Sequence, residues 1–109
     1  MPTQAEVQEV FPGMLTRFVP DKAKGVDATI QFELSGDTGG TYWVKIADGQ
    51  ATWGEGTADS PSMVFKSKDE DFIALMTGTL NPMQAFMMGK IKVNNMDLGM
   101  KMMQMFQMG

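Results

Sequence analysis

The side chains that could do chemistry in this chain are three consecutive carboxylates, Asp69, Glu70 and Asp71. Such a group could hold a metal ion or supply an acid and a base. Consecutive positions fan side chains around a helix, however, and no histidine or further acidic cluster completes a coordination shell. Negative charge also suits the first turn of a helix, where the helix dipole favours it. We therefore interpret the three residues as a solvated first turn, and we expect no metal site.

The chain has neither cysteine nor histidine in its 109 residues. Their absence excludes disulfides, thiol chemistry, Ser-His-Asp and Cys-His catalysis, and the commonest zinc ligand. Tyr42, the serines and the carboxylates form no recognisable pair of nucleophile and base. We expect no catalytic residue, no cofactor and no enzyme activity.

Methionine is the unusual component of this sequence. All but four of the 13 methionines (Met1, Met14, Met63 and Met76) lie in the stretch 78–108. Methionine is unbranched and flexible, so it fills irregular apolar space and adapts to varied guests. Thioethers also bind Cu(I), but no histidine or cysteine accompanies them here. The cluster is therefore either a soft core or the lining of a cavity.

Composition predicts one globular domain spanning residues 1–109, with 43% hydrophobic and 20% charged residues. The net charge of -4 argues against nucleic-acid binding, which requires a basic surface. No apolar run approaches the ~20 residues of a membrane span, and the first residues lack the pattern of a signal peptide. We expect a soluble, cytoplasmic protein.

The N-terminal segment is expected to form a helix. Thr3 and Glu6 make the capping box T-x-x-E that often starts one. Pro12-Gly13 interrupts the segment and predicts a kink or two abutting helices. Apolar residues recur at spacings of three and four and predict one buried stripe, made of Val7, Val10, Phe11, Met14, Leu15 and Phe18.

Two further helices are marked by their caps. Ser67 and Glu70 form a second capping box, and Gly78 is placed to end that helix. Asn81-Pro82 then supplies a capping amide and a proline at the first helical position, and Gly89 follows the expected end.

Between these helices the apolar period changes to two, which is typical of strands. We expect an antiparallel meander of three strands between Val26 and Glu55, with Asp48-Gly49 as a type I′ turn. Short strands should follow at Met63–Lys66 and Lys90–Val93. The alternation leaves one sheet face for helices and one for water.

The last helix has more apolar surface than one sheet can cover. At ~100° per residue, its polar stripe is narrow and contains Asp97, Lys101, Gln104 and Met108. A helix packed on one sheet needs an apolar stripe only a little over ~100° wide. The surplus must contact a ligand, another subunit or a membrane, unless it is simply core. It comprises Met96, Leu98, Gly99, Met100, Met102, Met103, Met105 and Phe106.

The segment 78–93, GTLNPMQAFMMGKIKV, resembles the C-terminal signature of the sterol-carrier-protein-2-like lipid-transfer domain. Met96, Leu98, Met100 and Lys101 continue the match, which extends upstream through Asp69-Glu70-Asp71-Phe72, Asp48-Gly49, Trp43 and Gly25-Val26-Asp27 to cover essentially the whole chain. The compact N-terminus resembles that of stand-alone prokaryotic members.

The resemblance implies an α+β fold, in which a five-stranded mixed sheet carries helices on one face and encloses an apolar tunnel. Such a tunnel accepts sterols, fatty acids, fatty acyl-CoA or phospholipids, and no covalent chemistry takes place in it. We therefore expect a cavity of roughly a few hundred Å³ with the last helix as a movable wall. Its expected lining is Ile30, Phe32, Val44, Trp53, Phe65, Met76, Met83, Phe86, Met87, Met100 and Met103.

Two alternatives stay open at this point. The Met-rich C-terminal helix could serve as a dimer interface, or it could dock the chain beside a lipid-modifying enzyme as an accessory module. Lys90 and Lys92 could also touch anionic head groups in a transient membrane contact. Expected partners are thus a lipid and possible membrane contact, no nucleic acid, and a monomer or a homodimer.

Overall fold

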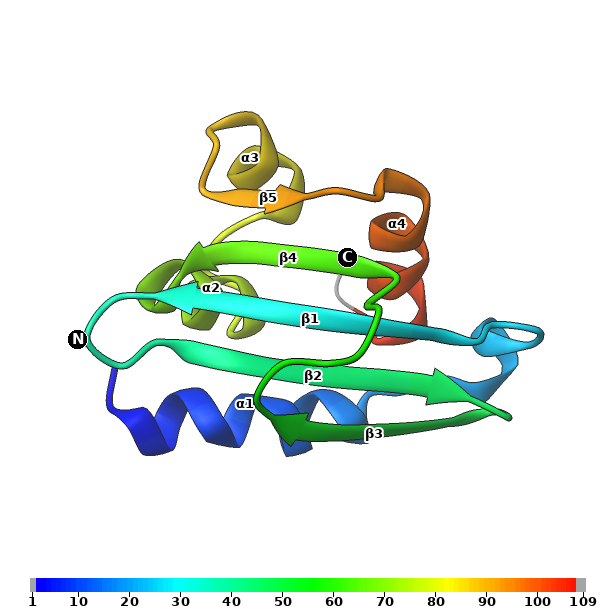
Figure 1. Ribbon diagram of the computed structural model, residues 1–109. Helices are drawn as coiled ribbons and strands as arrows, with labels where there is room; N and C mark the ends of the chain where they lie inside the picture. Colours follow the sequence, from blue (N-terminus) through cyan, green and yellow to red (C-terminus); the bar gives the residue numbers. More distant parts are fainter. Residues whose placement is uncertain (1, 108–109) are drawn as a thin grey trace.

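The computed structural model describes residues 2–107, which form helices and five strands (Figure 1). This confirms the predicted α+β class. In chain order the elements are α1 (Gln4–Thr16), η1 (Pro20–Ala23), β1 (Ala28–Ser35), β2 (Gly40–Ala47), β3 (Gln50–Glu55), β4 (Met63–Lys68), α2 (Asp69–Met76), α3 (Pro82–Met87), β5 (Ile91–Val93) and α4 (Met96–Met105).

The strands form one mixed sheet in the order β3-β2-β1-β4-β5. The pairs β1–β2 and β2–β3 are antiparallel, so the predicted meander is confirmed. Asp48 and Gly49 turn the chain between β2 and β3 with φ angles of 54° and 72°, as a type I′ turn requires. β4 lies parallel to β1, and β5 lies antiparallel to β4 at the edge of the sheet.

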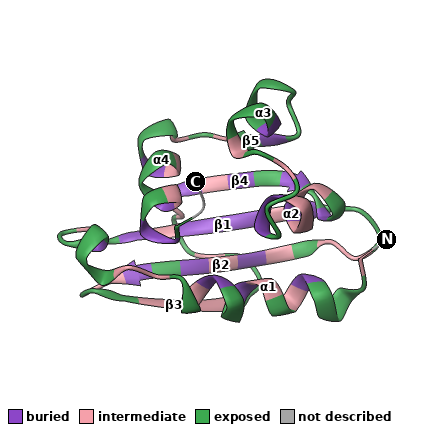
Figure 2. Cartoon of the chain, turned by 180° about the vertical axis from the view of Figure 1, so that it is seen from behind, coloured by how far each residue is buried: buried purple, intermediate pink, exposed green. Residues whose placement is uncertain are grey.

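Helices α1, α2 and α4 cover one face of the sheet, and Figure 2 marks buried residues both on the strands and on these helices. Because strand side chains alternate, every second residue points to this inner face. The inner-face residues of the three central strands are buried; they are Ala28, Ile30, Phe32, Leu34, Tyr42, Val44, Ile46, Met63 and Phe65.

Phe11 of α1 is an aromatic centre of this core. Its ring centroid lies 4.5 Å from that of Tyr42, 5.6 Å from Trp53 and 5.5 Å from Phe72. Aromatic pairs at such distances add packing energy beyond their buried area. Phe11 therefore joins α1 to the sheet and to α2.

The outer face of the sheet is less open than the alternation predicts. The alternation of β1 puts Gln31 on the face left for water, yet Gln31 is only 7% exposed. The loop after β3 crosses the outer face, where Ala58 N–H donates to Gln31 Oε1 at 2.9 Å and Ser62 N–H donates to Thr29 O at 2.8 Å. The loop rather than a helix covers Gln31, and strand period alone does not reveal such a cover.

α1 begins as predicted, runs through Pro12 without a break and ends at Thr16, two residues before Phe18 of the predicted stripe. The capping box is present, because Glu6 N–H donates to Thr3 Oγ1 and Thr3 N–H donates to Glu6 Oε1. Pro12 lies inside one continuous helix, so the alternative of two abutting helices is wrong. Proline removes one backbone hydrogen bond. The buried side chains of Val7, Phe11 and Met14 hold both halves of the helix on the core.

The predicted Ser67–Glu70 capping box is wrong. β4 continues to Lys68, and Ser67 pairs with Leu34 of β1. Lys68 is the N-cap residue of α2 and its side chain makes no capping bond. Strand pairing with β1 carries the chain two residues beyond the predicted end at Lys66, so α2 starts only at Asp69.

The later helix ends are confirmed. Gly78 and Gly89 adopt φ angles of 83° and 76° directly after the C-cap residues of α2 and α3.

Met108 of the predicted polar stripe lies outside the described residues. None of the helices in residues 2–107 combines the length and apolar character needed to cross a bilayer.

Candidate ligand-binding groove

An apolar groove lies between α3 and α4, with β4 and β5 beneath it. None of its lining side chains carries a charge or a hydrogen-bonding group other than a thioether. The arrangement suits hydrocarbon and offers nothing to a polar ligand. The lining is Phe65, Leu75, Pro82, Met83, Phe86, Ile91, Val93, Met96, Gly99, Met100, Met102 and Met103.

Local signals fix one wall of the groove, the short helix α3. Asn81 Oδ1 accepts hydrogen bonds from Met83 N–H at 2.9 Å and Gln84 N–H at 3.2 Å. At the other end Lys90 N–H donates to Ala85 O at 2.8 Å across Gly89, which closes a Schellman motif. Ala85 is the one buried residue of α3. The helix is thus well capped but weakly anchored.

Two consecutive asparagines position the other wall, α4. Asn94 Oδ1 accepts from Val64 N–H at 2.8 Å, and Asn95 Nδ2 donates to Ser62 O at 3.3 Å. Asn95 Oδ1 also caps α4 by accepting from Leu98 N–H at 3.1 Å. These bonds attach the start of α4 to the start of β4, and so place the methionines of α4 over the sheet.

The free space inside the groove is only about 70 Å³. This is far less than the expected few hundred Å³, and it equals the liquid volume of about two water molecules. The reason is the flexibility of the lining, because methionine and phenylalanine side chains occupy apolar space that would otherwise be a costly void. The groove is nearly closed by its own walls.

The structure brings five of the eleven predicted lining residues together in this groove. They come from three separate elements: β4, α3 and α4. These residues are Phe65, Met83, Phe86, Met100 and Met103.

The other six lie elsewhere. Ile30, Phe32 and Val44 are fully buried in the core beneath the helices, and Trp53 packs half-buried against Phe11. Met76 is buried beside a second groove, and Met87 is 80% exposed. The prediction assigned Ile30, Phe32 and Val44 to a cavity, whereas direct packing between helices and sheet buries them.

Some residues of the groove were missed by the sequence reading. Ile91 and Val93 share the inner face of β5, and Leu75 reaches the groove from α2. The alternation Lys90-Ile91-Lys92-Val93 was a usable signal for the first two. No local pattern points Leu75 towards α3.

The second groove lies between α1 and α2 and has a free volume of about 560 Å³. Val10, Met14, Ile73 and Met76 give it an apolar floor, but Glu6, Glu9 and Arg17 stand around it. It is larger and more polar than the groove between α3 and α4. We regard it as the rival location for an apolar ligand.

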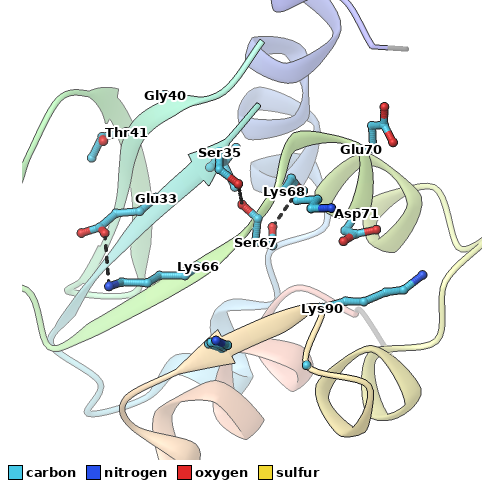
Figure 3. A pocket seen from close by; sticks show the side chains of 13 residues that line it. Glu33, Ser35, Gly40, Thr41, Lys66, Ser67, Lys68, Glu70, Asp71 and Lys90 are labelled. Atoms are coloured by element: carbon cyan, nitrogen blue, oxygen red, sulfur yellow. Dashed lines mark hydrogen bonds and ion pairs between the residues drawn. The ribbon is translucent and has the colours of Figure 1, made fainter. Parts of the chain in front are cut away.

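A hollow of about 740 Å³ with charged side chains around it lies at the end of the sheet (Figure 3). Lysines and carboxylates face it together, including Lys68, Lys90, Glu70 and Asp71. Its mixed charges and its open form do not suit a hydrocarbon chain.

Asp69, expected in a solvated turn, is buried instead. Its carboxylate accepts from Thr38 N–H at 3.0 Å, Thr38 Oγ1 at 2.7 Å and Glu70 N–H at 2.8 Å. The hydrogen bond from the Thr38 hydroxyl holds the pKa of Asp69 below its usual value, against the opposing effect of burial. Within residues 2–107 no cluster of acidic side chains could hold a metal ion. Asp69 therefore has a structural role.

Comparison with known proteins agrees with this fold. The model of the SCP-2 sterol transfer family matches residues 14–107, and the chain belongs to this family. It is an SCP-2-like lipid-binding or lipid-transfer domain, a kind of domain that is itself non-catalytic.

The relatives place the domain in longer proteins. The chain is 36% identical over 99 residues to hydroxysteroid dehydrogenase-like protein 2 of Bos taurus, which covers 88% of this chain. It spans only 23% of that relative's length. The stand-alone prokaryotic type expected from the sequence is therefore not established.

Two solved structures share the fold. Palmitated SCP2L2 of Aedes aegypti superposes with a TM-score of 0.73 at 21% identity, covering 91% of this chain and 89% of that one. A sec-alkylsulfatase of Pseudomonas sp. contains a similar unit, with a TM-score of 0.71 at 20% identity, over 84% of this chain and 15% of the sulfatase.

Proposed function

We propose that this chain acts as a single domain that binds a lipid through its acyl chain or ring system in the groove between α3 and α4, and transfers it between membranes. The wholly apolar lining of the groove, with methionines at its mouth, carries this proposal. The ligand class is a fatty acid, fatty acyl-CoA, phospholipid or sterol-like molecule. The palmitate on the similar Aedes aegypti protein makes a fatty acid the first ligand to test.

The energetics suit a carrier. Burying a 16-carbon chain removes about 15 methylenes from water, which is worth about 12 kcal/mol gross. A bilayer offers nearly the same stabilisation, so the groove needs only rough parity with the membrane. Flexible methionines at Met83, Met100 and Met103 give that parity without a rigidly shaped pocket.

Binding requires the groove to widen well beyond its present 70 Å³. α3 is the wall that can move most easily, since it buries only Ala85 and is joined to β5 through Gly89. We infer that α3 swings away from α4 and that the methionine side chains of α4 turn aside as the lipid enters.

The test is a titration of the delipidated protein with a fluorescent fatty acid in the absence of vesicles. Met103→Gln places a polar amide of similar shape in the half-buried wall of the groove, and we expect affinity to fall at least about tenfold, as for about 1.4 kcal/mol or more. Met87→Gln makes the same chemical change at a residue that is 80% exposed and outside the groove, so its affinity should stay unchanged.

A third variant separates the two apolar grooves. Val10→Gln alters the groove between α1 and α2 and should leave affinity unchanged. If Val10→Gln weakens binding while Met103→Gln does not, the ligand site lies between α1 and α2. If the wild-type protein binds no fatty acid or sterol probe at micromolar concentration, and no lipid can be extracted from it, the carrier function is wrong.

A second candidate function is an accessory module beside an enzyme that acts on lipids. The relatives support it, because the chain spans only 23% of the length of the Bos taurus dehydrogenase-like protein. In that role the groove would hold a lipid for a neighbouring active site rather than carry it between membranes. Transfer between donor and acceptor vesicles by the chain alone would favour the carrier; binding without transfer would favour the accessory module.

A further inference from the structure

We propose that the face made of α3, β5 and α4 docks on an anionic bilayer, with the mouth of the groove turned towards the membrane. This inference rests on the proposed function, because a carrier must exchange its lipid at a membrane. It deepens that function by naming the docking face and the charge of the partner surface. Two independent features of the surface carry it.

The first feature is a cluster of exposed apolar side chains. Met87 and Met88 at the end of α3 are 80% and 64% exposed, and Met100 of α4 is 54% exposed. Single exposed apolar residues are ordinary, whereas a gathered group marks a contact surface. All the exposed large apolar residues of the described chain belong to α3, α4 or the residue that follows α3: Met83, Phe86, Met87, Met88, Met96 and Met100.

Four members of this cluster also line the groove, so the mouth of the groove opens within the exposed apolar surface. They are Met83, Phe86, Met96 and Met100. A lipid that leaves the groove in solution would expose its apolar chain to water. If the same surface lies on a bilayer, the lipid passes from one apolar medium to another without that cost.

The second feature is the separation of charge along the chain. Residues 78–109 contain three lysines and one aspartate, a net charge of +2. Residues 1–77 contain six basic and twelve acidic residues, a net charge of -6, which accounts for the -4 of the whole chain. The part that carries the groove walls α3 and α4 is therefore the positive part of an acidic protein.

The three lysines of this part are Lys90, Lys92 and Lys101, and all are exposed. In residues 2–107 the one ion pair joins Lys66 Nζ to Glu33 Oε1 at 3.8 Å. Lys90, Lys92 and Lys101 therefore form no ion pair within the described chain. Acidic side chains do stand near them: Glu70 and Asp71 face the same hollow as Lys90 (Figure 3), and Asp97 lies on α4. Glu33 also lines this hollow, where four lysines (Lys66, Lys68, Lys90 and Lys92) stand against three carboxylates.

The arrangement of the sheet turns this charge separation into an orientation. β5 and α3 lie at one edge of the sheet, while β3 and the acidic first half of α1, with Glu6 and Glu9, lie at the opposite edge (Figure 1). An anionic bilayer attracts the first edge and repels the second. The same charges disfavour a second copy of the chain on this face, because two positive surfaces would then meet.

The experiment measures flotation of the protein with two kinds of vesicle at low salt, phosphatidylcholine alone and phosphatidylcholine with one third phosphatidylglycerol. We expect binding to the anionic vesicles only. The double variant Lys90→Glu/Lys92→Glu should bind them at least about tenfold more weakly, since each lysine near an anionic surface contributes about fivefold. Lys24→Glu/Lys45→Glu makes the same change of net charge at two exposed lysines that belong to none of α3, β5 and α4, and should lose much less.

The apolar cluster has its own variants. Met87→Ser/Met88→Ser removes the two most exposed methionines, neither of which lines the groove, and should weaken vesicle binding at least about fivefold. A tryptophan at position 87, made by Met87→Trp, should shift its fluorescence to the blue on anionic vesicles and be quenched by brominated acyl chains.

Several outcomes would overturn this docking face. One is an equal loss of vesicle binding in both charge-reversed double variants, which would reflect net charge alone. Others are no binding to either vesicle, or a stable dimer that Met87→Ser/Met88→Ser dissociates. The fluorescent fatty acid titration without vesicles separates these results from the proposed function. If the protein binds the fatty acid but no vesicle, the proposed ligand groove stands and only the proposed docking face is wrong.

Discussion

The carboxylate of Asp69 accepts two hydrogen bonds from Thr38, one from the backbone N–H at 3.0 Å and one from the hydroxyl at 2.7 Å. Thr38 lies in the turn between β1 and β2, and Asp69 is the first residue of α2. The pair therefore locks a hairpin to the helix that carries Leu75 into the groove. The Cβ that any other residue would add at Gly36 would lie 2.4 Å from Asp69 Oδ1, so the turn is also shaped around this carboxylate.

Replacing this carboxylate should destabilise the fold. We expect Asp69→Asn to lower the free energy of unfolding by about 1–3 kcal/mol, because the Thr38 donors lose a charged acceptor and an amide N–H₂ is placed against them. Urea unfolding followed by circular dichroism measures the change. Glu70→Gln in the same turn is exposed and should cost less than about 0.5 kcal/mol. Equal losses in the two variants would contradict the role of Asp69.

The same residue predicts how stability depends on acid. Its pKa is lowered in the folded protein, so the unfolded chain takes up a proton from Asp69 more readily than the folded chain does. The stabilisation is therefore complete above the ordinary aspartate pKa of about 3.9 and is lost as pH falls through the lower folded value. The difference in unfolding free energy between wild type and Asp69→Asn, measured from pH 7 downwards, should narrow only below about pH 4. A difference that already narrows between pH 7 and pH 5 would exclude this explanation.

A close contact on the outer face gives a second test of packing. A Cβ at Gly54 would lie 2.3 Å from Cζ2 of Trp43, which stands on the neighbouring strand. Gly54→Ala should therefore cost about 1–3 kcal/mol of unfolding free energy through overpacking and should alter Trp43 fluorescence. In a Trp43→Ala background the same substitution should cost almost nothing. If Gly54→Ala still lowers the free energy of unfolding in the Trp43→Ala background, the loss comes from the backbone at Gly54 and not from a clash with the indole.

Gly99 should behave in the opposite way. It lies inside α4, and an added Cβ would lie 3.7 Å from Met63 Sδ and Val93 Cγ2, which is ordinary contact distance. Alanine is favoured over glycine in a helix interior by about 0.8–1.0 kcal/mol, so we expect Gly99→Ala to raise the free energy of unfolding by roughly that amount. Thermal and urea unfolding both measure it. A loss of stability would mean that α4 lies closer to the sheet than these distances allow.

The groove also shows why local signals place walls better than cavities. The capping residue Asn81, the proline after it and Gly89 fix α3 within two residues of its prediction, because caps act on adjacent backbone groups. Whether an inward residue touches a guest or another side chain depends on how closely helix and sheet approach. Phe65 of β4 therefore lines the groove, whereas Phe32 of the neighbouring strand β1 contacts only other side chains of the core.

The sequence by itself determined the five strands, the meander, the helices α1, α3 and α4, and the family, because these follow from hydrophobic period, caps and a contiguous signature. It placed the start of α2 wrongly and did not predict η1. It also located the walls of the groove in the methionine-rich stretch 78–108. Tertiary structure alone decided that Asp69 is buried against Thr38, that Gln31 is covered by the loop after β3, and that the groove is nearly closed. Each of these depends on contacts between residues far apart in the chain, and their energies come from burial and hydrogen bonding that no local pattern encodes.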